Sequence, residues 1–328
     1  MDEVNDPSKA TTLAVVICTH DPQPDQLERT LSSLRQQDLP YAAWELLIVD
    51  NASTNGSLER VDMTWHPRAR MVRESRLGLT MARIRAIQET TSDLILFVDD
   101  DNVLAPGYLT RALGIAAREP QLGVFGAGVL EPEFEVAPAP DLLPYTTMLA
   151  LRTVPVASWS NDPQDACIPW GAGMVVTREV AQRYARIILD DPQKQRLDRA
   201  GNTLNSCGDD EFSWVSCEMG HGKGIFPELR VRHLIGRSRV DRAYLLRLAE
   251  GHAFSRTFLR HLHGLKVQQA MPPPSLGRAI GRLLSLRFGD AFYELHRWSS
   301  DRSRSATDRA FDDAKRKGIA RFFRTIHG

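Results

Sequence analysis

The first hundred residues alternate between short apolar runs and segments whose apolar residues recur at helical spacing, and this alternation restricts the fold most. In chain order the expected elements are a strand at 12–20, a helix at 27–37, a strand at 44–50, a short strand near 71–73, a helix at 79–90 and a strand at 93–101. Short β-branched runs of this kind are typical of strands buried in a parallel sheet. The succession therefore predicts an α/β fold with a mostly parallel sheet flanked by helices.

Beyond residue 101 the pattern is less regular. The expected elements are a strand at 122–130, a proline-rich loop at 131–145, a strand reaching residue 177, a helix at 178–185, a helix within 207–222, a strand at 224–235, a helix at 239–265, a linker at 271–275 and a helical tail. We therefore expect a disordered segment at 1–11, an α/β domain at 12–236 and a basic, helical extension at 237–328.

Composition is that of an ordinary globular protein. The 328 residues are 42% hydrophobic and 25% charged, which allows a sizeable core and excludes disorder throughout. The sequence has no run of 18 apolar residues, so we expect no membrane-spanning helix. The acidic, polar start MDEVNDPSKATT lacks the features of a signal peptide. The four cysteines form no CxxC pair, so we expect free thiols, no zinc site and a cytoplasmic protein.

The net charge of zero hides an uneven distribution. From Gly236 onward there are 19 basic and 8 acidic residues, a net charge of +11, so the preceding residues carry −11. An acidic half often gathers carboxylates around a cation, and a basic tail often faces phosphates or an anionic surface. The alternative is that the two halves attract each other.

Carboxylates stand at the ends of the expected strands. Asp99, Asp100 and Asp101 directly follow an apolar run, where their mutual repulsion would be relieved by a hard divalent cation with oxygen ligands. Asp50 ends the neighbouring strand and should open onto the same crevice, because ligands of open α/β sheets bind beyond the carboxyl ends of the strands. The alternatives are a solvated acidic turn for the triplet and an Asx-turn for Asp50.

Two further segments carry candidate groups. Asp209 and Asp210 follow Gly208 at the start of an expected helix, where one of them is either a general base or a helix cap. His233 closes the last expected strand, and its position suits a metal or phosphate contact as well as a structural role. No glycine fingerprint for dinucleotides, no P-loop and no G-x-S-x-G nucleophile elbow occurs in the sequence.

Together these segments resemble a family 2 glycosyltransferase with the GT-A fold, a Rossmann-like α/β architecture. The resemblance covers Thr12 to His233, and its pieces keep the order of the family: VVICTHD, LSSLRQQ, LLIVDNAST, RLGLTMARIRAI, LILFVDDDN, PWGAGMVVTRE and GDDEFSW. The family implies a sugar donor joined to a nucleoside diphosphate, an acceptor hydroxyl, and Mn²⁺ or Mg²⁺ as cofactor.

The resemblance also implies roles for individual residues. Nucleotide-binding positions are Thr19, Asp50, Gly78, Arg83, Asp99 and Asp100, with Asp99 opening the D-x-D motif; metal-binding positions are Asp101 and His233; and the loop bordering donor sugar and acceptor holds Trp170, Gly171 and Gly173. For the base, one alignment of the family motif selects Asp209 and another selects Asp210. We favour Asp209.

The implied activity is a metal-dependent, inverting hexosyl transfer, since one base without a protein nucleophile favours inversion. A carbohydrate or lipid-linked acceptor in cell-surface glycan synthesis is the usual destination in this family. Two alternatives stay open, a non-catalytic sugar- or nucleotide-binding protein on the same scaffold and a nucleotidyltransferase. The latter usually has a glycine-rich loop after the first strand, whereas CTHDPQPD has no glycine.

The tail segment AIGRLLSLRFGDAFYELHRW, residues 279–298, has a broad apolar stripe with Arg282, Arg287 and Arg297 beside it. A basic amphipathic helix of this kind can lie in an anionic membrane surface, which would place the protein at the inner face of the membrane. The alternative is that the stripe packs on the α/β domain or on a second subunit, as in a homodimer. Nothing resembles a nucleic-acid-reading motif, so we expect no nucleic-acid partner.

Overall fold

The computed structural model describes residues 11–201 and 203–327, so nearly all of the segment expected to be disordered, 1–11, lies outside the described residues. The chain divides into two compact units. Unit 1 holds the described residues up to Ala137 together with Leu149–Arg237, and unit 2 holds Pro138–Met148 and the described residues from Ser238. The short segment Pro138–Met148 thus groups with the C-terminal helices.

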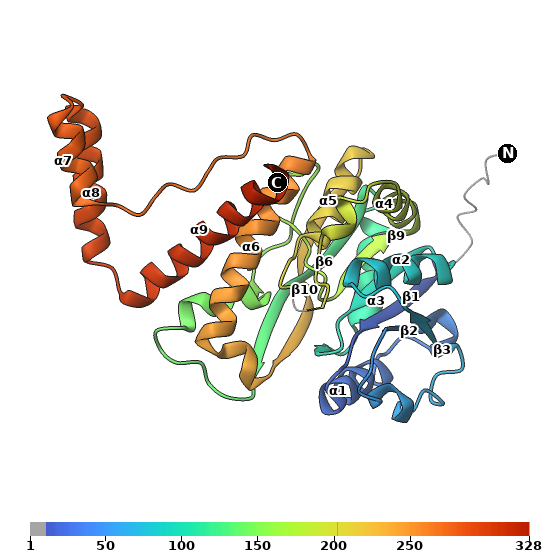
Figure 1. Cartoon of the computed structure of the whole chain (residues 1–328). Helices are drawn as coiled ribbons and strands as arrows, with labels where there is room; N and C mark the ends of the chain where they lie inside the picture. The colour runs from blue at the N-terminus through green and yellow to red at the C-terminus, as the bar shows by residue number, and fades with distance from the viewer. Residues whose placement is uncertain (1–10, 202, 328) are drawn as a thin grey trace. The chain divides into compact units, whose positions relative to one another are not determined.

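Unit 1 is built on a ten-stranded sheet, counted over the described residues, whose main order is β3-β2-β1-β4-β9-β6-β10-β5 (Figure 1). Its first four strands are parallel: β1 Leu13–Thr19, β2 Trp44–Asn51, β3 Ala69–Glu74 and β4 Leu94–Val98. This half of the sheet agrees with the expectation of a parallel sheet. Its strands β1, β2 and β4 are the buried apolar runs that the sequence indicates.

The second half of the sheet is mixed. It contains β9 Met174–Thr177, β6 Leu122–Phe134, β10 Gly222–Ile235 and β5 Asn102–Leu104, with β7 Arg152–Thr153 beside β6 and β8 Ser158–Ser160 beside β10. Only β6 and β10 pair in parallel here, side by side along most of their length (Figure 1). The proline-rich loop expected from residue 131 was wrong for 131–134, because these residues continue β6 and pair with β10.

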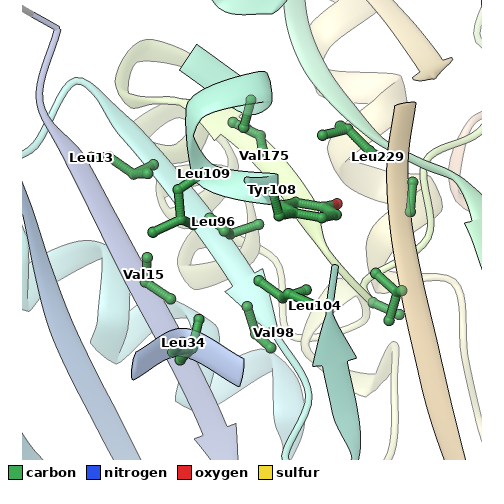
Figure 2. Packing of buried hydrophobic residues seen from close by; sticks show 14 of the residues in the cluster. Leu13, Val15, Leu34, Leu96, Val98, Leu104, Tyr108, Leu109, Val175 and Leu229 are labelled. Carbon is green, nitrogen blue, oxygen red and sulfur yellow. The ribbon is translucent and has the colours of Figure 1, made fainter. Parts of the chain in front are cut away.

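Both faces of the sheet are buried. Alternate residues of β1 point to opposite sides, so Val15 joins one apolar cluster and Val16 the other. The first cluster packs under α1 Pro24–Arg35 and α3 Tyr108–Arg118, and Figure 2 shows Leu34, Tyr108 and Leu109 against the sheet residues. The second packs under α2 Leu79–Glu89, α4 Arg178–Asp190 and α5 Gly208–Glu218.

Neither β5 nor α3 was expected from the sequence. Tyr108 of α3 is fully buried, and its hydroxyl donates to the carbonyl oxygen of Gly173 at 2.6 Å, which ties α3 to the loop before β9. Short 3₁₀ turns complete the chain at η1 Tyr41–Ala43, η2 Ser57–Arg60, η3 Leu143–Leu149, η4 Lys194–Arg196 and η5 Arg237–Val240. The four cysteines are free thiols, as the sequence predicts.

Unit 2 consists mainly of helices: α6 Arg242–Leu262, α7 Leu276–Leu284, α8 Phe288–Arg302 and α9 Ala306–His327. A Cβ added at Gly318 of α9 would clash with the carbonyl oxygen of Glu250 in α6, which shows that these two helices pack closely. Within the described residues no helix is long and apolar enough to cross a membrane. The single amphipathic helix expected at 279–298 was wrong, because the helix breaks after Leu284, where Leu286 adopts a left-handed φ of 58°.

A close backbone approach in the sheet permits a stability test with a matched pair. A Cβ added at Gly128 of β6 would lie 2.7 Å from the carbonyl carbon of Phe226 in β10, whereas one added at Gly114 of α3 would find its nearest neighbour at 4.0 Å. Gly128→Ala should lower the free energy of unfolding by about 1–3 kcal/mol through overpacking. Gly114→Ala should raise it by about 0.5–1 kcal/mol through helix propensity. Urea denaturation measures both, and an equal effect would refute the close packing.

Candidate functional site

The site lies at the edge of the sheet where β1, β2 and β4 end. Thr19 of β1 is in register with Asp50 of β2, and Ile17 is in register with Val98 of β4. Because the three strands are parallel, Thr19, Asp50 and the aspartates after Val98 emerge at one edge, as the sequence predicts.

Hydrogen bonds fix the turn formed by the aspartate triplet. The Thr19 hydroxyl donates to the carboxylate of Asp100, and the Thr30 hydroxyl donates to the Asp100 carbonyl oxygen at 3.0 Å. The side-chain amide of Asn102 donates to Oδ1 of Asp101 at 2.9 Å. The triplet is therefore an ordered turn with half-buried or buried carboxylates and not a solvated surface turn.

The sheet brings His233 to Asp101 from 132 residues away. Strand β10 runs antiparallel to β5, which places His233 opposite Asn102. Nε2 of His233 lies 3.2 Å from Oδ2 of Asp101, and the two residues are only 3% and 9% exposed. Both residues assigned to the metal by resemblance thus stand in direct contact.

The electrostatics of this edge suit a cation. Burial, followed by the neighbouring Asp101 carboxylate, raises the pKa of Asp99 above its ordinary value, and Arg83 and His233 only partly oppose this. Among the described residues no group of three or more His, Cys, Asp or Glu side chains forms a complete metal site. The carboxylates of Asp99 and Asp101 and the imidazole of His233 offer donors that suit Mg²⁺ or Mn²⁺, which typically take one or two protein carboxylates and complete their coordination shell with substrate phosphates.

Asp50 is engaged on the other side of the edge. Its Oδ1 accepts a hydrogen bond from the Ser53 N–H at 2.8 Å, which is the Asx-turn considered as the alternative, and its Oδ2 forms an ion pair with Arg73 of β3. These two partners orient the Asp50 carboxylate, and the residue is only 8% exposed.

Asn51 is a positioning residue that the sequence analysis missed. Its side chain donates to the carbonyl oxygens of Glu74 and Arg76 and accepts the N–H of Gly78 at 2.7 Å. Gly78 has a φ of 143°, which a residue with a side chain rarely adopts. The glycine assigned to the nucleotide stretch is thus held by Asn51 at the start of α2.

Arg83, assigned to the same stretch, is buried in α2 with 3% exposure. It donates to Oδ2 of Asp198 at 2.8 Å. Burial alone would lower the pKa of Arg83, but the carboxylates of Asp198, Asp209 and Asp99 raise it above its ordinary value. Arg83 therefore interacts electrostatically with both acidic clusters that the sequence singles out.

The loop before β9 meets the first turn of α5. The N–H of Gly173 donates to the Phe97 carbonyl oxygen of β4 at 3.0 Å, and Gly173 has a φ of 78°. The N–H of Gly171 donates to Oδ2 of Asp209 at 3.0 Å. A Cβ added at Gly171 would meet the guanidinium of Arg83, so a larger residue at this position would have to displace the end of the Arg83 side chain.

Arg152 and Trp170 flank Asp209 and its neighbour Asp210. The Arg152 guanidinium lies 3.2 Å from the centroid of the Trp170 ring. Burial lowers the pKa of Arg152 to about 10, although the carboxylates of Asp209 and Asp210 act in the opposite direction. Asp210 is half-buried, and its N–H donates to Oδ1 of Asp209 at 3.1 Å. The hydrogen bond from Gly171 ties Asp209 to the loop.

Asp198 and Arg152 had no signal in the sequence. Asp198 lies in an irregular segment, has a left-handed φ of 65°, and accepts hydrogen bonds from Arg83 and from the N–H of Gly208, the first residue of α5. Arg152 belongs to a two-residue strand. An isolated charged residue in an irregular segment looks like a surface residue until the fold buries it.

The comparisons with known proteins agree with this geometry. The model of the family described as Glycosyl transferase family 2, which the sequence motifs indicated, matches residues 14–156. The matched segment includes the strand-end aspartates but ends before the Trp170 loop and α5. Roles for those later residues therefore rest on their geometry and on the motif resemblance.

Two curated proteins are similar to part of this chain. The amylovoran biosynthesis glycosyltransferase AmsE of Erwinia amylovora is 28% identical over 112 residues, 33% of this chain and 41% of AmsE. An inactive polypeptide N-acetylgalactosaminyltransferase-like protein 5 of Macaca fascicularis is 27% identical over 123 residues, 36% of this chain and 28% of that protein. This chain thus covers less than half the length of these curated relatives.

The third similar protein is a solved structure. The mannosyltransferase PcManGT of Pyrobaculum calidifontis, determined with GDP-Man and Mn²⁺, superposes with a TM-score of 0.59 and 17% identity. The alignment covers 97% of this chain and 88% of that one. The likeness confirms the expected GT-A fold.

The buried pair of Arg83 and Asp198 generates a stability prediction. Asp198→Asn keeps the side-chain shape and the tolerance for left-handed φ but leaves a buried guanidinium with less compensating charge. The free energy of unfolding should fall by about 2–4 kcal/mol. Glu131→Gln, which removes the exposed pair with Arg230, should cost less than about 1 kcal/mol. Equal losses in urea denaturation would show that the buried pair has no special role.

Proposed function

We propose that the protein is a metal-dependent, inverting glycosyltransferase that moves a hexose from a nucleoside-diphosphate sugar to an acceptor hydroxyl. The observation that carries this proposal is the convergence of two acidic groups at one edge of a GT-A sheet. Asp101 contacts His233 there, and Asp209 is bonded to the loop residue Gly171. The family match and the fold shared with a donor-bound mannosyltransferase support the same reading.

Donor binding is assigned to the strand ends. Thr19 and Asp50 would face the base of the nucleotide. Asp99 and Asp100 would face the ribose and its surroundings. Asp101 and His233 would hold Mn²⁺ or Mg²⁺. When bound, the cation neutralises charge that develops on the departing diphosphate. Burial, followed by the Asp101 carboxylate, raises the pKa of Asp99, and a cation beside the triplet would offset the repulsion between these carboxylates, which supports this assignment.

The acceptor side is assigned to the loop and α5. Asp209 accepts the proton of the acceptor hydroxyl while the hydroxyl oxygen bonds to the anomeric carbon from the face opposite the diphosphate. The bond from the anomeric carbon to the diphosphate oxygen breaks, and its electron pair leaves with the diphosphate. The N–H of Gly171 orients the Asp209 carboxylate, and Trp170, held under Arg152, offers a ring for a sugar.

An active enzyme is favoured over a non-catalytic binder on this scaffold. Loss of function on a GT-A scaffold is known among the relatives, since one of them is named inactive. Here, however, both acidic clusters retain their carboxylates and their partners. The name of AmsE, an amylovoran biosynthesis glycosyltransferase, supports a biosynthetic role. The motif resemblance adds to this proposal a carbohydrate or lipid-linked acceptor in cell-surface glycan synthesis and a cytoplasmic location at the inner face of the membrane.

Thermal unfolding with nucleotide sugars and Mn²⁺ tests donor and metal binding together. At a donor concentration near 100 times its dissociation constant, binding should raise the unfolding temperature by about 5 °C or more. Asp101→Asn should abolish this shift and the transfer reaction, because it removes a carboxylate from the metal position. Excess chelator should act in the same way on the unchanged protein.

The control for this prediction is Asp38→Asn, an exposed aspartate just beyond α1, which should keep the full shift. Transfer that continues at full rate in excess chelator would contradict metal dependence. The absence of a shift with every nucleotide sugar would contradict the donor class.

The assignment of the base gives a second prediction. Asp209→Asn should lower turnover by about 100-fold or more while the thermal shift with donor survives, because general-base catalysis is commonly worth 10²–10⁴-fold. Asp210→Asn should reduce turnover less, since the loop bond belongs to Asp209. A dead Asp210→Asn enzyme beside an active Asp209→Asn enzyme would move the base by one residue.

A further inference from the structure

Helices α7 and α8 form a hairpin with a buried carboxylate between its two helices. Glu294 of α8 is fully buried. Its carboxylate binds Arg278 at 3.0 Å and Arg282 at 3.6 Å from α7, and Arg297 at 3.1 Å from α8. The buried apolar residues of the two helices are only the small side chains of Ala279 and Ala291. An ion cluster thus occupies the interior of the hairpin.

The large apolar side chains of the same hairpin point outward. The exposed residues are Leu276, Ile280, Leu283, Leu284, Leu286, Phe288, Phe292, Tyr293 and Leu295. They recur at helical spacing in both helices, so each helix carries an exposed apolar stripe. In a protein surrounded by water the apolar stripes of a helix pair pack together, and exposed clusters of this kind mark interaction sites. The hairpin is arranged the other way round, with ionic side chains between its helices and large apolar side chains on its surface.

The exposure is greatest at the tip, where α7 ends and α8 begins. Leu284 is 79% exposed and Leu286 is 76% exposed. Leu286 has a left-handed φ of 58°, a conformation that glycine would adopt at lower cost. A leucine at this position keeps an apolar side chain at the end of the hairpin despite that cost.

Basic and amphipathic side chains surround the apolar tip. Residues 271–304 contain six arginines and three carboxylates, a net charge of +3. Arg287 at the tip is exposed and pairs with Asp290 on the surface, and farther along α8 Arg297 lies over the ring of Tyr293 and Arg302 over the ring of Trp298. Aromatic rings with one polar end and arginines with apolar stems are the side chains that occupy membrane–water interfaces.

We propose that the α7–α8 hairpin docks on an anionic bilayer surface, with its tip leucines and Phe288 at the boundary of headgroups and acyl chains. Apolar insertion together with positive charge is the chemistry of an interfacial anchor. A narrow tip fits a deformable lipid layer better than a rigid protein surface. A second copy of the hairpin would bring the same net positive charge to the contact, so the charge favours lipid over self-association.

Co-sedimentation of the full chain with lipid vesicles tests the proposal. The vesicles are phosphatidylcholine with and without phosphatidylglycerol, at low and at high salt. The test variant is L284E/L286E, which places two carboxylates at the exposed tip. The matched control is V156E, a glutamate at an apolar residue of unit 1 that is 68% exposed. Circular dichroism verifies that both variants keep the native helix content.

The unchanged chain should bind phosphatidylglycerol vesicles, with weaker binding at high salt and on phosphatidylcholine alone. L284E/L286E should reduce binding by about tenfold or more, and V156E should leave it unchanged. Absence of binding to anionic vesicles, or equal binding by both variants, would overturn the proposal. So would a change from dimer to monomer in L284E/L286E without vesicle binding. Since no sugar transfer is measured, such a failure would leave the proposed glycosyl transfer intact and would remove only the proposed location at the membrane.

Discussion

The buried ion pair between Arg83 and Asp198 is the interaction on which the site depends. A guanidinium with 3% exposure is costly unless carboxylates surround it, and here Asp198 binds it while Asp99 and Asp209 raise its pKa. The same Asp198 carboxylate receives the N–H of Gly208, which positions the first turn of α5. The arginine thereby links the strand-end aspartates to the aspartate of α5, although these groups lie more than a hundred residues apart in the sequence.

The sequence predicts those parts of the site that depend on strand ends. Parallel buried strands have a simple apolar signature, and their carboxyl ends meet at one edge whatever the remaining chain does. The strand pattern alone therefore places Thr19, Asp50 and Asp101 together. It also places His233 at a strand end but not against Asp101, because that contact depends on β5, a strand of three residues whose pairing is specified by β10.

The remaining parts could not be predicted because long-range contacts decide them. Residues 131–134 contain a proline and two glutamates and look like a loop, yet the partner strand β10 makes them a strand. Asp198 resembles a surface residue until Arg83 is buried beside it. The break at Leu286 replaces one expected helix by two, and the buried Glu294 cluster that joins them involves residues 16 positions apart, beyond the reach of local helix periodicity.

The opposed charges of the two parts of the chain have different physical causes. In unit 1 the acidic residues gather around the buried guanidinium of Arg83, whose positive charge they balance. By our proposal, a bound cation balances the remaining carboxylates and the diphosphate of the donor. The basic part, from Gly236 onward, has eight carboxylates and nineteen basic side chains. Even if every carboxylate is paired with basic residues, as Glu294 is with three arginines, the segment keeps a positive charge. The excess positive charge must therefore be balanced from outside this segment. Since the hairpin exposes apolar side chains beside part of that charge, a surface that is both anionic and apolar satisfies the two requirements at once.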